Sequence, residues 1–285
     1  MRAATARAIL AAMQLQNGLV VGGLSVGGLE TCVDLPELRV AIDLGRVPDV
    51  AVARADVLFT HAHMDHMGGA PWHCATRSLR GLPPPRYVME RCHAEAFGRV
   101  MQAWRELDRS AMEHELVLVS PGDEVALHAG RKARCFRSTH VVPTLGWCVL
   151  ETRRKLRSDL AGAGRDAIVR LKEAGEPIHD EVEVPIFAHC GDTTIDVLER
   201  EELPRRAQVL MLECTFLDDS IGVAEARARG HVHLDEIRGR PELFDEVGTL
   251  VLSHLSPRWS PRAARAILDE RLPPALRAKC AYFLP

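Results

Sequence analysis

Four side chains that bind metal ions well lie within six residues of one another, directly after a short apolar stretch. Residues 55–60 (ADVLFT) predict a buried strand, and His61, His63, Asp65 and His66 follow it. Alternate residues of an extended segment point to the same side, so His61 and His63 can reach one cation. Asp65 and His66 follow where the chain turns toward a helix, and can reach a second cation. Because such a cluster is unfavourable without a cation, we expect the chain to fold around a metal centre.

One loop cannot fill two coordination shells, so further ligands should stand at the ends of later strands. Three candidates do: His140 ends RCFRSTH, Asp192 follows VPIFAHCG, and His254 ends TLVLSH. The carboxylate of Asp192 suits a bridging position, since it can offer one oxygen to each ion. Imidazole and carboxylate ligands without thiolate favour zinc, with manganese or iron as alternatives. The expected cofactor is therefore a pair of Zn²⁺ ions per chain.

Strands and helices alternate along the rest of the chain, which predicts an α/β sandwich with its site along one edge. The expected strands include residues 115–119, 124–128, 133–138 and 146–151, followed by VPIFAHC, AQVLMLEC and VGTLVLSH. Ser260 and Pro261 suit the start of a last helix, as N-cap and first helical residue. With 285 residues, 47% of them hydrophobic, we expect a single domain over residues 1–285.

A second helix is predicted over residues 92–108, with apolar side chains at the spacing of one helical face. We expect this stripe to be core, and it consists of Phe97, Val100, Met101, Trp104 and Leu107.

Residues 153–184 differ from their surroundings in the basic character of their first residues. We interpret them as an inserted basic segment, either a helix or an arm that projects from the domain. A solvated surface helix is the alternative. If the segment is an arm, its first cations are the candidate RNA contacts, namely Arg153, Arg154, Lys155 and Arg157.

Charge and cysteine usage exclude some classes of protein. A net charge of −3 gives no overall basic field, so a nucleic-acid partner would have to be held by local patches or by metal. The eight cysteines contain no Cys-x-x-Cys pair and fit reduced thiols better than a disulfide framework. The N-terminal stretch, residues 1–16, is predicted to be an amphipathic helix rather than a signal peptide. We expect a cytoplasmic protein without a membrane-spanning helix.

Seven stretches of the chain resemble one family. They are LSVGGLETC, HMDHMGG, ATRSLRGLPPP, GDTT, ECTFLDDS, GHVHLDEI and SHLSPRW. In this order and at these intervals they are similar to the metallo-β-lactamase superfamily, and within it to the short-form tRNase Z (RNase Z) enzymes of the plant type. The resemblance implies an αββα sandwich, a homodimer, and removal of the 3′ trailer from precursor tRNA by a hydroxide that bridges two metal ions. Cys190, Leu255 and Trp259 depart from the family pattern beside these motifs, either as packing changes or as marks of another substrate.

The resemblance also implies roles for single residues. His61, His63, His140 and Asp192 would hold the first ion, and Asp65, His66, Asp192 and His254 the second. His231 would donate a proton to the leaving oxygen with Glu213 as its orienting partner, so that Asp65, His231 and Glu213 are the residues expected to act in catalysis. Arg258 and Ser256 would contact a substrate phosphate, and for Arg258 the alternative is an arginine that caps a strand end. His233 is expected to be structural.

Two other functions fit the same residues. A hydrolase of small substrates, such as a phosphodiesterase, an arylsulfatase-like esterase or a lactonase, could use the same two metals. A non-catalytic RNA-binding module that has lost its metals is the second alternative, which the presence of all seven ligand residues disfavours.

Overall fold

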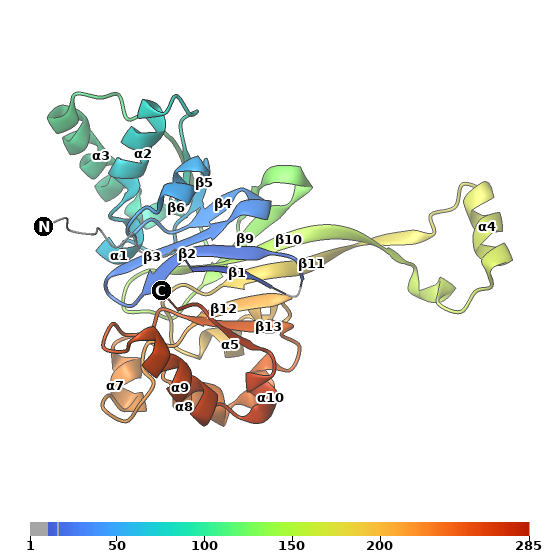
Figure 1. The fold of residues 1–285 in the computed structure, drawn as a ribbon. Coiled ribbons are helices and arrows are strands. Elements are labelled where there is room, and N and C mark those ends of the chain that lie inside the picture. Colours follow the sequence, from blue (N-terminus) through green and yellow to red (C-terminus); the bar gives the residue numbers. More distant parts are fainter. Residues whose placement is uncertain (1–10, 16, 285) are drawn as a thin grey trace, which may run out of the picture.

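Two seven-stranded sheets pack face to face in the structure, a computed structural model that describes residues 11–15 and 17–284 (Figure 1). The first sheet holds, in order, β1 (Ala11–Gln14), β2 (Val20–Val26), β3 (Glu30–Leu35), β4 (Val40–Ile42), β5 (Asp56–Leu58), β6 (Arg86–Glu90) and β7 (Glu115–Val119). The second sheet holds β14 (Cys280–Tyr282), β13 (Thr249–Ser253), β12 (Val209–Glu213), β11 (His179–His189), β10 (Leu145–Leu156), β9 (Lys132–Arg137) and β8 (Glu124–Ala126).

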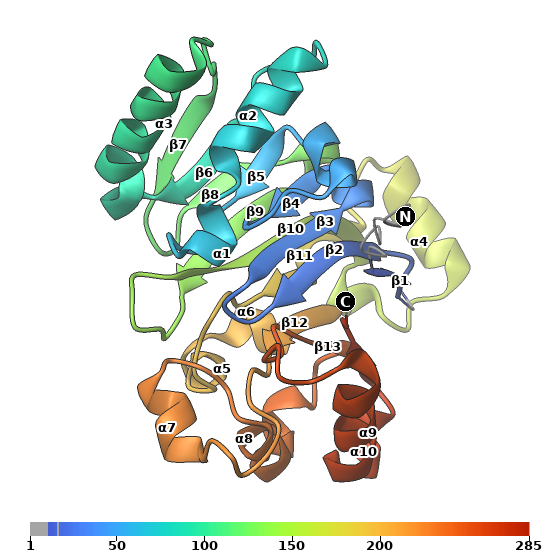
Figure 2. The ribbon, with the colours of Figure 1, turned by 60° about the vertical axis from the view of Figure 1, so that its left-hand side comes forward.

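Helices cover the outer faces of both sheets (Figures 1 and 2). The first sheet carries α1 (Met64–Met67), α2 (Ala70–Leu79) and α3 (Ala94–Asp108). The second carries α5 (Val197–Arg200), α6 (Glu202–Arg205), α7 (Val223–Ala228), α8 (Leu234–Gly239), α9 (Pro261–Arg271) and α10 (Pro274–Arg277). The predicted αββα sandwich is therefore confirmed. Ser260 caps α9 as expected, because its side chain accepts a hydrogen bond from the N–H of Ala263.

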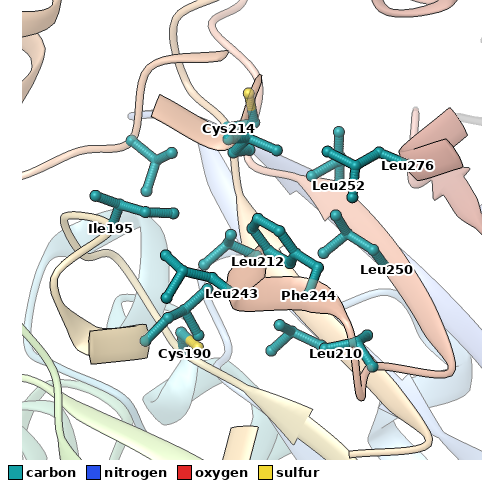
Figure 3. Packing of buried hydrophobic residues seen from close by; sticks show 14 of the residues in the cluster. Cys190, Ile195, Leu210, Leu212, Cys214, Leu243, Phe244, Leu250, Leu252 and Leu276 are labelled. Carbon is teal, nitrogen blue, oxygen red and sulfur yellow. The ribbon is translucent and has the colours of Figure 1, made fainter. Parts of the chain in front are cut away.

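Apolar side chains fill three layers. The layer between the sheets includes Trp147 and Phe187, and the layer under α2 and α3 includes Tyr87. Leu210 and Phe244 lie in the third layer, under the helices of the second sheet (Figure 3). Each sheet is thus covered on both faces, which explains why its central strands consist almost wholly of apolar residues.

Two expectations about helices are corrected. Phe97 and Met101 are buried under α3, but Val100, Trp104 and Leu107 are exposed, so the prediction that the whole stripe is core was wrong for these three. Only one side of α3 faces the sheet, and the stripe is wider than that side. The helix expected over residues 1–16 falls largely on residues 1–10, outside the described residues. Residues 11–14 form β1, because β2 offers them antiparallel backbone partners.

Strands β10 and β11 continue beyond the second sheet as a long hairpin that ends in α4 (Arg165–Glu173), far from the body of the domain (Figure 1). The segment 153–184 carries seven acidic side chains beside its seven basic ones, so the description "basic" fits only its first residues. Across the hairpin, Arg154 pairs in register with Glu181, and Lys155 with Asp180. The strands therefore bring opposite charges together, and neither strand presents a continuous basic surface.

The helices of the described residues are all too short or too polar to span a membrane.

The sheet topology gathers strand ends at one edge. Strands β11, β12 and β13 are parallel neighbours, and β9 runs in the same direction because β10 is antiparallel to both β9 and β11. Glu213 is the last residue of β12, and the loops that follow β9, β11 and β13 contain His140, Asp192 and His254. The carboxyl ends of parallel strands are a common place for ligand sites, and this edge holds the candidate site.

Candidate metal centre

The seven predicted ligand residues meet at this edge of the sandwich. His61 and His63 lie in the loop after β5, and Asp65 and His66 belong to α1. Their side chains approach those of the later loops in two groups. The first group is His61, His63, His140 and Asp192, and the second is Asp65, His66 and His254. Within each group the ligand atoms lie within 4.8 Å of one another.

Asp192 stands between the two groups. Its Oδ2 lies 3.8 Å from Nε2 of His61, while its Oδ1 lies 3.4 Å from Nε2 of both His66 and His254. Asp65 Oδ2 lies 3.6 and 3.7 Å from the same two nitrogens. These separations are too long for good hydrogen bonds. They are close to the roughly 3.3 Å expected between two ligands that each bind one tetrahedral zinc at about 2.1 Å.

Buried ring nitrogens without a partner support the same reading. Among the described residues, Nε2 of His61, His66, His140 and His254 is buried and has no hydrogen-bond partner. Leaving such groups unpaired costs about 1–3 kcal/mol each, so the cluster is unfavourable unless a cation accepts the four lone pairs. The donor set of imidazoles and carboxylates fits a divalent metal centre.

The opposite ring nitrogen of each of these histidines is held in place. Nδ1 of His66 lies 2.8 Å from Oδ2 of Asp43, and Nδ1 of His140 donates to the carbonyl of Gly230 at 2.8 Å. His61 and His254 each use a threonine hydroxyl, that of Thr60 at 3.0 Å and that of Thr215 at 3.1 Å. Fixing Nδ1 in this way leaves Nε2 free and aims it at a metal.

The two threonines link these histidines to buried carboxylates through hydrogen bonds. Thr60 donates through its hydroxyl to Asp43 at 2.7 Å, and Thr215 donates to Glu213 at 2.6 Å. Asp43 also accepts the backbone N–H of Thr60 at 2.7 Å. Sequence reasoning missed Asp43, Thr60 and Thr215. For Asp43 the available signal was its position directly after the strand-like residues VAI, the same pattern that pointed to Asp192.

The electrostatics keep His61 in its neutral form. Burial lowers the pKa of His61, and the neighbouring imidazole of His66 lowers it further. For Asp192, burial opposes ionisation, but the imidazoles of His254 and His66 outweigh it and hold the pKa well below the usual value. A neutral imidazole and an ionised carboxylate are the forms that bind metal.

His231 lies beside this cluster, with its ring 5.1 Å from that of His140 and 5.6 Å from that of His254. Its Nδ1 is 2.7 Å from Oε1 of Glu213. Burial lowers the pKa of His231, but the Glu213 carboxylate outweighs burial and raises the pKa to about 9. Glu213 is itself fixed by the N–H of Thr193 at 2.9 Å. The pair can therefore present a protonated imidazole next to the metal-binding groups.

Arg258 and Ser256, the predicted phosphate contacts, lie on the side of the candidate centre where His231 stands. Arg258 is exposed, donates to the hydroxyls of Ser256 and Ser220, and stands 5.8 Å over the ring of Phe216. The ring of Phe216 is 6.1 Å from that of His231. Arg229, which sequence reasoning missed, also approaches the Phe216 ring, at 5.7 Å.

Other predicted residues lie away from the centre. Arg153, Arg154, Lys155 and Arg157 are on the outer part of the hairpin, where Arg153 pairs with Glu151 and Arg157 with Asp159. His233 is structural as expected: it is buried and caps α8, accepting the N–H of Asp235 at 3.1 Å.

The three departures from the family pattern all pack in the third layer. Cys190 and Leu255 are buried in it, and Trp259 packs against it (Figure 3 shows Cys190). Their side chains therefore belong to the core beside the motifs rather than to the ligand groups.

Comparison with known proteins decides the family. The chain is 36% identical over 270 residues to tRNase Z TRZ1 of Arabidopsis thaliana, an alignment that covers 94% of this chain and 95% of that protein. The chain belongs to the tRNase Z family.

Solved structures show the fold that tRNase Z members share with other proteins. The metallo-β-lactamase fold protein YhfI from Bacillus subtilis superposes with a TM-score of 0.60 at 13% identity, over 91% of this chain and 92% of that one. Human tRNase Z, short form, superposes with a TM-score of 0.53 at 17% identity, over 85% and 86% of the two chains. No family model matches the chain.

Proposed function

We propose that this chain is a metal-dependent endoribonuclease that removes the 3′ trailer from precursor tRNA. The observation that carries the proposal is the placement of the His231–Glu213 pair beside two candidate ligand groups, the first of which contains Asp192 while the second lies within 3.4 Å of it, in a chain of the tRNase Z family. A phosphodiester is cleaved efficiently when its charge is neutralised and its leaving oxygen is protonated. Bound metal ions would neutralise the charge, and the His231–Glu213 pair would supply the proton.

Two Zn²⁺ ions are the cofactors we propose. His61, His63, His140 and Asp192 would hold one ion, and the second would be held by Asp65, His66, His254 and the other oxygen of Asp192. Two cations bound there would supply ionisation of a shared water and neutralisation of phosphate oxygens. The buried, unpartnered Nε2 atoms favour zinc, which binds imidazole readily, over magnesium or calcium.

His231 would protonate the leaving ribose oxygen. Glu213 raises the pKa of its imidazole to about 9, which keeps the proton available near neutral pH. Proton donation of this kind contributes typically about 10²- to 10⁴-fold to a rate. Asp65 would take part in catalysis as a ligand of the second ion, since its carboxylate approaches both His66 and His254.

Exposed cations around the centre would hold the RNA backbone. Arg258 and Arg229 approach the Phe216 ring next to His231, and Ser256 accepts a hydrogen bond from Arg258, so these side chains are suited to a phosphate on that side. A groove of about 430 Å³ beside His140 is bordered by the exposed Arg200, and by Arg227, which pairs with Asp196 and Glu236; Arg200 would face the neighbouring backbone there. Contacts of this kind position RNA without reading its sequence.

The hairpin would grip the tRNA body at a distance. Strand β11 rises about 3.3 Å per residue, so the turn beyond His179 is more than about 30 Å from the metal-binding edge at His189. Figure 1 draws α4 and α1 on opposite sides of the molecule. We propose a homodimer, because in a dimer the hairpin of one subunit can serve the centre of the other. The eight free cysteines support a cytoplasmic setting.

Cleavage of a 3′-extended precursor tRNA by zinc-loaded protein tests the function. The expected products are a tRNA that ends after the discriminator nucleotide and a trailer with a 5′ phosphate, and Asp192→Ala should give neither. Parallel hydrolysis of bis(4-nitrophenyl) phosphate separates the proposal from a small-substrate hydrolase. Activity on the small ester without any trailer release would reject the tRNA assignment, and less than one metal ion per chain after metal-replete purification would reject the metalloenzyme.

A further inference from the structure

A short segment between two helices carries the candidate proton donor. Residues 230–233 contain His231 and lie between the ends of α7 and α8. The same segment holds a candidate metal ligand, because the carbonyl of Gly230 accepts Nδ1 of His140 at 2.8 Å. With so few residues between the two helices, the placement of α7 and α8 decides where the His231 ring stands.

The last turn of α7 places the backbone of His231. The N–H of His231 donates to the carbonyl of Ala226 at 3.0 Å, and the N–H of Gly230 donates to the carbonyl of Arg227 at 2.9 Å. Together with a φ of +77° at Gly230, these two bonds form a Schellman motif. His231 is the second residue after the C-cap in this motif, so a movement of α7 moves His231 with it.

The start of α8 fixes the other end of the segment. Nδ1 of His233 accepts the N–H of Asp235, and the N–H of His233 donates to Oε2 of Glu236 at 3.2 Å, which together form a capping box. The side chain of Glu236 is buried. Its second oxygen therefore needs a donor, since an unpaired buried carboxylate is unfavourable.

Arg227 supplies that donor and reaches a third segment. Its Nη1 donates to Oε1 of Glu236 at 2.6 Å, and its Nη2 donates to both carboxylate oxygens of Asp196, at 2.7 and 2.6 Å. Asp196 lies four residues after Asp192, at the start of α5. Hydrogen bonds between charged groups are the strong ones. One side chain of α7 thus ties that helix to α8 and to the segment that carries Asp192.

The two carboxylates make Arg227 a poor phosphate contact. They offset its charge, so it attracts an anion less than the exposed Arg200 on the same groove does. A second cation, Arg240, approaches the same carboxylates less closely, at 3.9 Å from Asp196 and 3.7 Å from Glu236. Arg240 follows α8 and so does not connect α7 to the others.

We propose that Arg227 is a positioning residue for the His231 proton donor, which it holds in place by tying α7 to α8 and to Asp196. The proposal rests on the proposed function in one respect, since it takes His231 to be the donor; the hydrogen bonds of Arg227 are independent of it. The ligand residues would also be held by the bound ions. The His231 ring depends on its backbone and on its contact with Glu213, so the loss of Arg227 affects the donor first.

Two esters of thymidine 5′-phosphate that differ only in their leaving group test the proposal. The 4-nitrophenyl ester loses a stable anion that needs no proton, whereas the phenyl ester benefits from a proton donor. With zinc-loaded protein, Arg227→Ala should lose at least tenfold in kcat on the phenyl ester and on precursor tRNA. It should change less than twofold on the 4-nitrophenyl ester, in KM for precursor tRNA and in zinc content. Arg240→Ala is the matched control and should resemble the wild type.

A double variant shows whether the effect passes through the donor. Arg227→Ala combined with His231→Ala should lose no more on the phenyl ester than His231→Ala alone, because the donor that Arg227 places is already gone. Losses that multiply instead would overturn the proposal. Arg227→Lys keeps the charge and covers the case in which Arg227→Ala fails to fold; it should show a smaller loss confined to the same two substrates.

Three other results would also overturn the proposal. Equal losses on both esters, or a loss of zinc, would show that Arg227 supports the whole centre. A higher KM for precursor tRNA with an unchanged kcat would make Arg227 a phosphate contact. An unchanged ratio of the two esters would mean that Arg227 does not act on the donor. Because the esters contain no tRNA, ester hydrolysis without trailer release would reject the proposed function and still leave the role of Arg227 measurable.

Discussion

Nδ1 of His66 lies 2.8 Å from the buried carboxylate of Asp43, so a residue outside the histidine cluster fixes one of the candidate metal ligands. Asp43 is fully buried and accepts two further hydrogen bonds from Thr60, at 2.7 Å each. Because Thr60 also binds Nδ1 of His61, one carboxylate orients a ligand in each of the two groups. Partners of this kind raise the basicity of the imidazole and set its orientation.

Asp43→Asn should therefore weaken metal binding about 10- to 100-fold, the usual effect of losing such a partner. Chelator competition followed by metal analysis measures the affinity directly. Asp34→Asn is the control, since Asp34 is also buried but pairs with Arg54 away from the centre. If both variants bound metal alike, Asp43 would have no special role at the site.

The sequence predicted the parts of the centre that adjacent residues or strand ends reveal. The ligand residues from His61 to His66 are close together in the sequence, and Asp192 and His254 each follow a buried strand. Asp43 stands 23 residues from its partner His66, and the backbone of Asp43 adopts a φ of 61°. Neither the pairing nor the positive φ can be inferred from the residue type.

The exposed part of α3 escaped prediction for a different reason. A helical stripe of apolar residues shows that one side of a helix is apolar, but not how much of that side a sheet will cover. Phe97 and Met101 meet the sheet, while Val100 and Trp104 remain outside it. Periodicity gave no means of separating the core residues of the stripe from its exposed ones.

The pH profile should depend on Glu213. Because Glu213 raises the pKa of His231, the donor stays protonated up to about pH 9, and activity should fall as the pH rises through that value. Glu213→Gln removes the charge, so the pKa of His231 drops and the alkaline limb of kcat should move to lower pH. His231→Ala should lose that limb and about 10²- to 10⁴-fold in kcat. An alkaline limb that stays in place in Glu213→Gln would show that another group controls it.

Shortening the hairpin should affect tRNA and small substrates differently. Residues 155–180 can be replaced by an Asn-Gly turn, because Arg154 and Glu181 are paired in register and the turn suits an antiparallel hairpin. We expect a higher KM for precursor tRNA and a weaker dependence of binding on salt, since phosphate contacts are lost. Hydrolysis of bis(4-nitrophenyl) phosphate should be unchanged. Equal affinity for precursor tRNA in the two proteins would contradict the gripping role.

Gly230 should tolerate no side chain, because it holds His140 by its backbone. Its carbonyl accepts Nδ1 of His140, its φ is +77°, and a Cβ there would lie 2.6 Å from that same nitrogen. Gly230→Ala must therefore push the His140 ring away from the first group, and the left-handed backbone adds about 1 kcal/mol of strain. We expect loss of the metal ion bound by His61, His63 and His140, with a fall in melting temperature that excess zinc partly restores. Gly239→Ala, at the exposed end of α8 where a Cβ meets open space, is the matched control and should keep both metal and stability. Full metal occupancy in Gly230→Ala would mean that His140 is not held where its hydrogen bond to Gly230 puts it.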